Sequence, residues 1–260
     1  MSQEVHDKVG RVRSIAALAA ALLITPHLLF AQAGAPTRES SPSGKDSAAF
    51  DPTGYWTSVV TENWRMRMVP PAKGDYLGIP ISATGKQAAD AWDLAKDEAA
   101  GNQCKAFGAP AIMNLPTHLH ITWQDDNTLK MDIDFGNQTR VFHLGNWTAA
   151  AHARSLQGNS AATWTSRRGS GGPATAKYLR IATTDLLPGY LRRNGIPYGE
   201  DASLVEYVDL FQEPNGGALL VWTAVVNDPV NLEVPYMLTS QFKKLANGSA
   251  WDPTSCTLRW

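Results

Sequence analysis

The chain has 260 residues, of which 23 are lysine or arginine and 24 are aspartate or glutamate, so its formal net charge at pH 7 is −1. Apart from short pairs such as the arginines at 167–168 and 192–193, no basic block is present. This argues against nucleic acid as a partner, because proteins that bind nucleic acid concentrate positive charge in patches. The nine tryptophans predict either a packed core or an aromatic-lined pocket, and composition does not separate the two.

The N-terminal residues have the order of a secretory signal peptide. Basic residues precede the apolar run SIAALAAALLITPHLLF, and the small residues AQA follow at 31–33. This order predicts a signal peptide over residues 1–33, cleaved after Ala33. The apolar run is about 17 residues long, against about 20 for a bilayer span, and Pro26 and His27 interrupt it. We therefore expect no stable membrane insertion after cleavage, and a secreted or periplasmic protein.

Residues 34–49 are small and polar, which predicts a disordered linker. The remaining residues, 50–260, are numerous enough to form a single domain with its own core. Most of that domain alternates hydrophobic and polar side chains at the period of a β-strand. The predicted strands are Tyr55–Val69, Leu119–Trp123, Leu129–Phe135, Thr139–Leu144, Thr175–Thr184, Leu204–Gln212, Ala218–Val226 and Tyr236–Lys244.

Three other segments interrupt the strand pattern. An alanine-rich segment predicts one helix from Thr84, which can cap it, to about Ala100, and Gly101 ends it. Two segments rich in glycine and polar residues, Asn146–Pro173 and Leu187–Ser203, predict long loops.

Eight strands joined mainly by short turns predict an antiparallel barrel or a highly curved sheet. In FDPTGYWTSVV, Gly54-x-Trp56 lies at the start of the first strand, and Arg259 lies near the C-terminus in CTLRW. In these two patches the chain resembles the lipocalins, in which an arginine covers that tryptophan. The resemblance implies a mainly β fold: a single antiparallel lipocalin-like β-barrel of about eight strands with one inserted helix (about 84–100). Lipocalins carry their helix after the last strand, whereas here it follows the first.

The two cysteines, Cys104 and Cys256, are exported with the chain. In an oxidising compartment two such cysteines usually pair, which predicts a disulfide bond that ties the C-terminal segment to the body. Two separate buried thiols are the alternative.

Three of the six histidines lie in THLHITWQDDNTLKMDIDFGNQTRVFHLG. A three-residue loop at 126–128 places His118 and His120 on a polar face, with His120 opposite Asp134. A second three-residue turn then pairs Asp134 with Arg140 and turns His143 to the apolar face. Because the third histidine points away, we expect no metal site.

The polar face of this hairpin has two interpretations. It is either the solvated outer surface, with weak cross-strand pairs, or the lining of the barrel interior. In the second case His120, His118 and Asp134 are candidate catalytic residues, because a carboxylate orients an imidazole for acid–base chemistry.

Glu206 in LVEYVDLFQ alternates with Leu204, Val208 and Leu210. A carboxylate on an apolar inward face must be paired or kept neutral. Glu206 is therefore a candidate catalytic residue, and the alternative is a buried ion pair with an arginine such as Arg65, Arg67 or Arg180.

The candidate ligand-binding residues come from three other segments. Trp56 and Trp64 share a face of the first predicted strand, which is either core or the wall of an apolar pocket. Tyr190 and Arg192 lie in a glycine-containing loop that is either a lid contacting an anionic group or a solvated loop. His143, expected on the apolar face of the hairpin, is the fifth candidate ligand-binding residue.

Three classes of function follow from these observations. The first is a secreted or periplasmic β-barrel that binds a small, largely apolar or aromatic molecule in its interior. The second is a cofactor-independent acid–base enzyme, such as a lyase, isomerase, cyclase or hydratase, acting on such a molecule. The third is a structural or partner-binding domain with a filled core. A covalent hydrolase or a nucleotide-dependent oxidoreductase is disfavoured because the sequence lacks a nucleophile elbow and a dinucleotide fingerprint, and we expect no cofactor.

Overall fold

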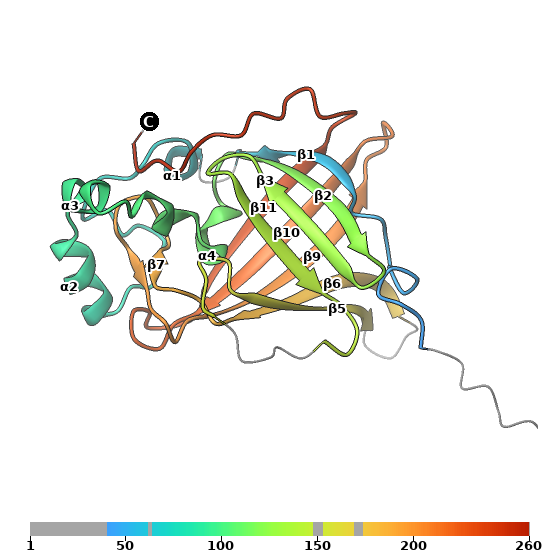
Figure 1. The fold of residues 1–260 in the computed structure, drawn as a ribbon, viewed down its shortest axis with the longest axis horizontal. Coiled ribbons are helices and arrows are strands. Elements are labelled where there is room, and N and C mark those ends of the chain that lie inside the picture. The colour runs from blue at the N-terminus through green and yellow to red at the C-terminus, as the bar shows by residue number, and fades with distance from the viewer. Residues whose placement is uncertain (1–40, 62–63, 148–152, 169–173, 260) are drawn as a thin grey trace, which may run out of the picture. The chain divides into compact units, whose positions relative to one another are not determined.

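Nine strands close into a barrel, and the short helices gather at one end of it (Figure 1). The computed structural model describes residues 41–61, 64–147, 153–168 and 174–259. The predicted signal peptide, residues 34–40 of the predicted linker and parts of the predicted loop Asn146–Pro173 lie outside the described residues. Around the barrel the strands follow the order β1-β11-β10-β9-β6-β5-β4-β3-β2.

The bounds of the elements are as follows. The barrel strands are β1 (Gly54–Val59), β2 (His118–Asp125), β3 (Thr128–Ile133), β4 (Gln138–His143), β5 (Asn159–Arg168), β6 (Ala174–Thr184), β9 (Ser203–Gln212), β10 (Ala218–Asn227) and β11 (Tyr236–Lys244), and the short strands β7 (Gly189–Tyr190) and β8 (Pro197–Tyr198) pair with each other. The helices are α1 (Trp64–Met68), α2 (Ala83–Ala91), α3 (Leu94–Ala99), η1 (Gln103–Phe107) and α4 (Ala109–Ile112).

The predicted mainly β barrel is confirmed, with one strand more than expected. The additional strand is β5, which lies within the predicted loop Asn146–Pro173. Ser160 and Ala162 are its buried residues, so its inward face is small and partly polar and the sequence lacks a hydrophobic alternation there. β5 pairs with β4 in parallel, whereas every other pair in the barrel is antiparallel.

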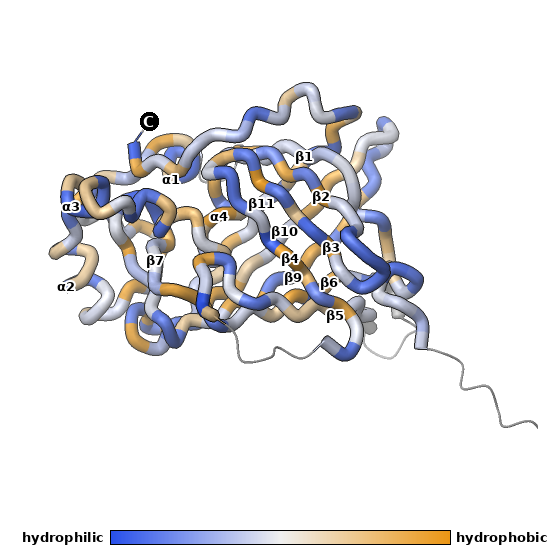
Figure 2. Tube along the Cα trace, in the orientation of Figure 1, coloured by the Kyte–Doolittle hydropathy of each residue, from blue (hydrophilic) through white to orange (hydrophobic). Residues whose placement is uncertain are grey.

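The alternation that predicted the strands also forms the core. Along the barrel strands hydrophobic and hydrophilic residues succeed one another (Figure 2), and the hydrophobic set points inward. Large side chains from many strands meet there, among them Trp56, Leu119, Met131, Phe142, Trp222 and Phe242. In a β-strand, alternate side chains point to opposite faces. The hydrophobic alternation in the sequence therefore predicts which side chains of most strands point inward.

The first strand is shorter than predicted. β1 ends at Val59, and residues 64–68, expected to continue the strand to Val69, form the short helix α1. Arg67 of α1 donates hydrogen bonds to the carbonyl oxygens of Val59 and Asn114, each at 2.9 Å. These bonds fix α1 at the end of β1. As a result Trp64 is 61% exposed and does not line the barrel.

The predicted helix 84–100 is two helices. The hydroxyl of Ser82 caps α2, so the helix begins one residue earlier than expected. Asp93 starts α3 by accepting hydrogen bonds from the backbone N–H groups of Ala95 and Lys96. A side chain that caps a new N-terminus interrupts the helix before it. Gly101 (φ +71°) ends the second helix, as expected.

The predicted loop Leu187–Ser203 is packed into the structure, so its interpretation as a solvated loop is wrong. Every residue from Leu191 to Ile196 is buried. Gly195 (φ +81°) lies against the indole of Trp92, where a Cβ would come within 2.2 Å of the ring. This glycine therefore permits close packing and does not act as a hinge.

At the opposite end of the barrel from the helices, Trp56 is fully buried and its indole N–H donates to the carbonyl oxygen of Pro52 at 2.9 Å. The cation over its ring is Lys244, with Nζ 4.5 Å from the ring centroid. Arg259, expected in that place, instead pairs with Glu98 at 2.5 Å. A basic side chain therefore covers the tryptophan, as the resemblance implies, but it is Lys244 and not Arg259.

Residues just before the first strand are folded against the barrel. The backbone N–H of Gly44 donates to Asn127 Oδ1 at 2.6 Å, and its carbonyl oxygen accepts from the indole of Trp164 at 2.9 Å. The end of the predicted linker therefore belongs to the folded unit, which covers residues 41–260. In the described part of the chain, no helix is long and apolar enough to cross a membrane.

The predicted disulfide bond between Cys104 and Cys256 is confirmed. It joins η1 to the C-terminal segment, which runs from β11 back across β1 towards the helices (Figure 1). The two cysteines are 152 residues apart.

We expect the double substitution Cys104→Ser/Cys256→Ser to lower the free energy of unfolding by about 5 kcal/mol, because the bond removes the entropy of a loop of this length from the unfolded chain. Urea denaturation of the oxidised wild type, the reduced wild type and the double variant measures the effect. The reduced wild type should match the variant. Equal stability of all three would contradict the prediction.

Candidate functional site

A buried ion pair occupies the middle of the barrel. Glu206 of β9 accepts two hydrogen bonds from Arg140 of β4, NH1 to Oε1 at 2.7 Å and NH2 to Oε2 at 2.6 Å. Both side chains are 0% exposed. Trp222 of β10 donates its indole N–H to Oε1 of the same carboxylate at 2.7 Å. The expected inward direction of Glu206 is correct, but its partner is Arg140 and not Arg65, Arg67 or Arg180.

Arg140 was expected on the polar face of the hairpin, opposite Asp134. The structure pairs Ile133 with Gln138 and Met131 with Arg140, because the turn between β3 and β4 holds four residues and not three. Its backbone includes Gly136 (φ +89°) and Asn137 (φ +48°). The register differs from the expected one by an odd number of residues, so every side chain of β4 points to the opposite face from the one expected. Arg140 therefore points into the barrel.

Neighbouring polar and aromatic groups complete the surroundings of Arg140. Its NH2 lies 3.5 Å from Thr183 Oγ1, which in turn lies 2.8 Å from Ser160 Oγ. The guanidinium carbon is 5.1 Å from the ring centroid of Phe142. Since neither charged side chain has water-accessible surface, the middle of the barrel is filled by side chains where Glu206 lies. The catalytic role predicted for Glu206 finds no space for a substrate beside the carboxylate.

The polar face of the β2–β3 hairpin points outward, as the solvated interpretation requires. Leu119 pairs with Ile133 and His120 with Asp132, two residues away from the expected register. Asp134 therefore lies beside His118, with Oδ2 2.6 Å from Nδ1 of the imidazole. His120 does not contact Asp134 but stacks on Tyr55, with ring centroids 4.1 Å apart.

Asp134 is held firmly. It accepts hydrogen bonds from the backbone N–H groups of His118 and Phe135, each at 2.7 Å, and from Thr117 Oγ1 at 2.8 Å. The His118 side chain is 30% exposed. The two residues therefore form an oriented imidazole–carboxylate pair at the outer surface, and any acid–base role belongs to His118 and not to His120.

His143 faces outward and stacks on Trp147, with ring centroids 4.2 Å apart. The expectation that it joins the apolar face is wrong, for the same reason that Arg140 lies inside. Within the described residues, no three histidine, cysteine, aspartate or glutamate side chains come together as metal ligands do.

Tyr190 is part of a cluster around Asp97. The carboxylate of Asp97 accepts hydrogen bonds from the Tyr190 hydroxyl at 2.5 Å, the Trp92 indole at 2.7 Å and Asn102 Nδ2 at 3.1 Å. Burial raises the pKa of Asp97, but these hydrogen bonds outweigh it and the net pKa is lowered. Burial and the hydrogen bond to Asp97 raise the pKa of Tyr190. Tyr190 therefore stabilises this cluster and does not close over a barrel opening.

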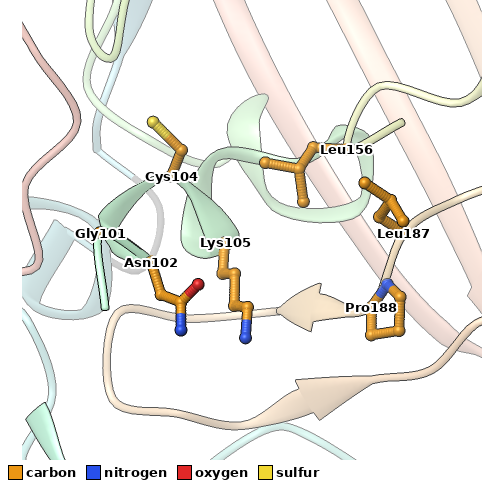
Figure 3. Close-up of a pocket in the computed structure, with 7 residues that line it drawn as sticks. All are labelled: Gly101, Asn102, Cys104, Lys105, Leu156, Leu187 and Pro188. Carbon is orange, nitrogen blue, oxygen red and sulfur yellow. The ribbon is translucent and has the colours of Figure 1, made fainter. Parts of the chain in front are cut away.

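A hollow of about 330 Å³ lies next to this cluster. Figure 3 shows the residues that line it: Gly101, Asn102, Cys104, Lys105, Leu156, Leu187 and Pro188. Its polar groups already have partners. Asn102 donates to Asp97, and Lys105 Nζ lies 5.9 Å from the ring centroid of Tyr190.

A groove of about 340 Å³ lies beside the first residues of β11. Because β1 pairs with β11 only as far as Val59 opposite Gln241, the first half of β11 extends past the end of β1. The groove is formed there by Met66, Leu77, Gly78, Asn114, Arg192, Tyr236, Met237, Leu238 and Thr239. Leu77 and Met237 are 71% and 64% exposed.

Arg192, predicted to bind a ligand, lines this groove and is only 8% exposed. Its NH1 donates to the carbonyl oxygen of Leu77 at 2.7 Å. Within the described part of the chain its Nε has no hydrogen-bond partner and no carboxylate forms a salt bridge with it. Sequence reasoning pointed to Arg192 but not to Leu77 or Met237, whose local patterns are those of an ordinary turn and strand.

The predicted site residues thus fall into separate places: Glu206 inside the barrel, His118, His120 and His143 on its outer surface, Tyr190 beside Asp97, and Arg192 in the groove beside β11. Comparison of the chain with family models, with curated proteins and with solved structures gives no match.

The ion pair generates a prediction about stability. We expect Glu206→Gln and Arg140→Met each to lower the free energy of unfolding by about 3–5 kcal/mol. The first leaves the charge of Arg140 without a negative partner in the core, and the second leaves the charge of Glu206 without a positive one. The double variant should lose less than either single variant. Urea denaturation followed by tryptophan fluorescence measures all four proteins, and single variants as stable as the wild type would contradict this account.

Proposed function

We propose that this protein is an exported β-barrel that binds a small, largely apolar molecule, and that the molecule lies in the groove beside the first half of β11. The observation that carries the proposal is the exposure of Leu77 and Met237 on the lining of a groove of about 340 Å³. Its volume falls in the range of roughly 300–1,000 Å³ that is usual for ligand sites.

The lining combines apolar side chains with the polar Asn114, Arg192 and Thr239, and the apolar ones support this choice of site. Apolar side chains exposed together at the rim of a groove indicate a surface that a ligand covers. Met66 and Met237 supply unbranched, polarisable side chains, which adapt to ligands of different shape. The middle of the barrel is a poorer candidate, because the ion pair of Arg140 and Glu206 fills it.

The enzyme alternative retains one observation in its favour, the pair of His118 and Asp134. The His118 side chain is 30% exposed and is held by the buried carboxylate of Asp134. Such an imidazole is able to exchange protons with a bound molecule. It lies on the outer face of β2 and lines neither the groove beside β11 nor the hollow of Figure 3. Binding is therefore the better supported function.

Export is supported by the N-terminal segment 1–33 and by the disulfide bond between Cys104 and Cys256. Expression of the full chain in a bacterium with a secretory pathway should give a product that begins at Gly34, since the signal peptidase cleaves after the small residues AQA. N-terminal sequencing of the exported fraction checks this. A product that keeps residues 1–33 would contradict export by a cleaved signal.

The binding site is tested with N-phenyl-1-naphthylamine, a neutral probe that fluoresces in apolar surroundings. We expect the double variant Leu77→Ser/Met237→Gln to bind it about tenfold or more weakly, because each substitution removes apolar contact area. Both residues are exposed, so the unfolding midpoint should not change.

Leu187→Ser is the matched control, because Leu187 is also an exposed leucine (42%) but lines the hollow of Figure 3. It should bind the probe like the wild type. Loss of binding in the control alone would move the site to that hollow. A wild type that binds no probe would favour the alternative of a structural domain with a filled core.

A further inference from the structure

Four arginines are buried in the described residues: Arg67, Arg140, Arg192 and Arg193. Arg140 is neutralised by Glu206. Arg192 differs from it, because no carboxylate among the described residues pairs with it. A guanidinium removed from water without a negative partner is costly, and this one lines the groove described above.

Within the described residues, one hydrogen-bond donor of the guanidinium is satisfied and another is not. NH1 is used by the carbonyl oxygen of Leu77 at 2.7 Å, whereas Nε has no hydrogen-bond partner among the described residues. Gly78 lies next to NH2, and a Cβ at that glycine would lie 3.7 Å from it. A side chain at position 78 would therefore contact NH2.

We propose that Arg192 binds the carboxylate of an amphipathic ligand whose apolar part lies against Leu77, Met66 and Met237. This inference rests on the proposed function and names its ligand class: a small monocarboxylate with an apolar chain or ring. An arginine presents N–H donors in a fixed fork that matches the two oxygens of a carboxylate.

The size of the groove limits the ligand. A volume of about 340 Å³ corresponds to about eleven water molecules at their share of liquid volume. A carboxylate with a chain of about eight carbons, such as octanoate, is therefore of suitable size. Asn114 and Thr239 provide the other polar side chains of the lining.

The test compares octanoate with 1-octanol, which has the same chain and no charge. Each ligand displaces N-phenyl-1-naphthylamine from the wild-type protein, and the displacement gives its affinity. We expect octanoate to bind about tenfold or more tightly than 1-octanol, the scale of one charge-assisted hydrogen bond. This comparison needs no variant and does not depend on the folding of one.

Variants then locate the preference. Arg192→Met keeps an unbranched side chain without charge and should bind octanoate and 1-octanol equally, with the affinity for 1-octanol retained. Arg65→Met is the matched control: it removes the same charge from an exposed position on α1 and should keep the preference for octanoate.

The outcomes separate the two proposals. Equal binding of octanoate and 1-octanol by the wild type would overturn the carboxylate site and leave apolar binding in place. A preference that survives in Arg192→Met would overturn the role of Arg192. Failure of the wild type to bind the probe or either ligand would overturn both proposals. If Arg192→Met does not fold, Arg192→Lys replaces it, and an unchanged preference ratio in that variant would count against the forked geometry.

Discussion

The ion pair between Arg140 and Glu206 determines what the rest of this barrel can do. Both charges have lost their water, and the loss is offset only because the guanidinium and carboxylate meet through two hydrogen bonds and Trp222 supplies a third. Such an arrangement requires close packing on all sides. A pair of this kind therefore leaves no space for a ligand beside Glu206, and the hollows lie elsewhere.

The wall is incomplete because β1 is short. Its pairing with β11 stops at Val59 opposite Gln241, and α1 takes the place of a longer strand. Arg67 secures this replacement by donating to Val59 and Asn114. On the side away from β10, the first half of β11 consequently has no partner strand, and residues of α1 and Leu77 line the groove there. The groove is thus a direct consequence of where one strand ends.

For most strands the sequence predicted which face is buried, because that depends on a period of two; β4 is the exception. It did not predict the registers, which depend on turn geometry. A shift of two residues in β2–β3 kept the faces and exchanged His120 for His118 beside Asp134. A turn of four residues before β4 reversed its faces and brought Arg140 to Glu206. β5 was missed because Ser160 and Ala162 give its inward face no hydrophobic signal.

The candidate groove was harder to predict, since it joins α1, a turn, a buried loop and the start of β11 that are distant in sequence. Only Arg192 carried a signal, and the comparison with Arg140 shows why it matters. Among the described residues, Arg140 is paired with a carboxylate, whereas the hydrogen bond of Arg192 goes to the carbonyl oxygen of Leu77. A carbonyl oxygen satisfies one donor but does not neutralise the charge. No carboxylate among the described residues neutralises Arg192, and its place in the lining of the groove is the basis for proposing an anionic ligand there.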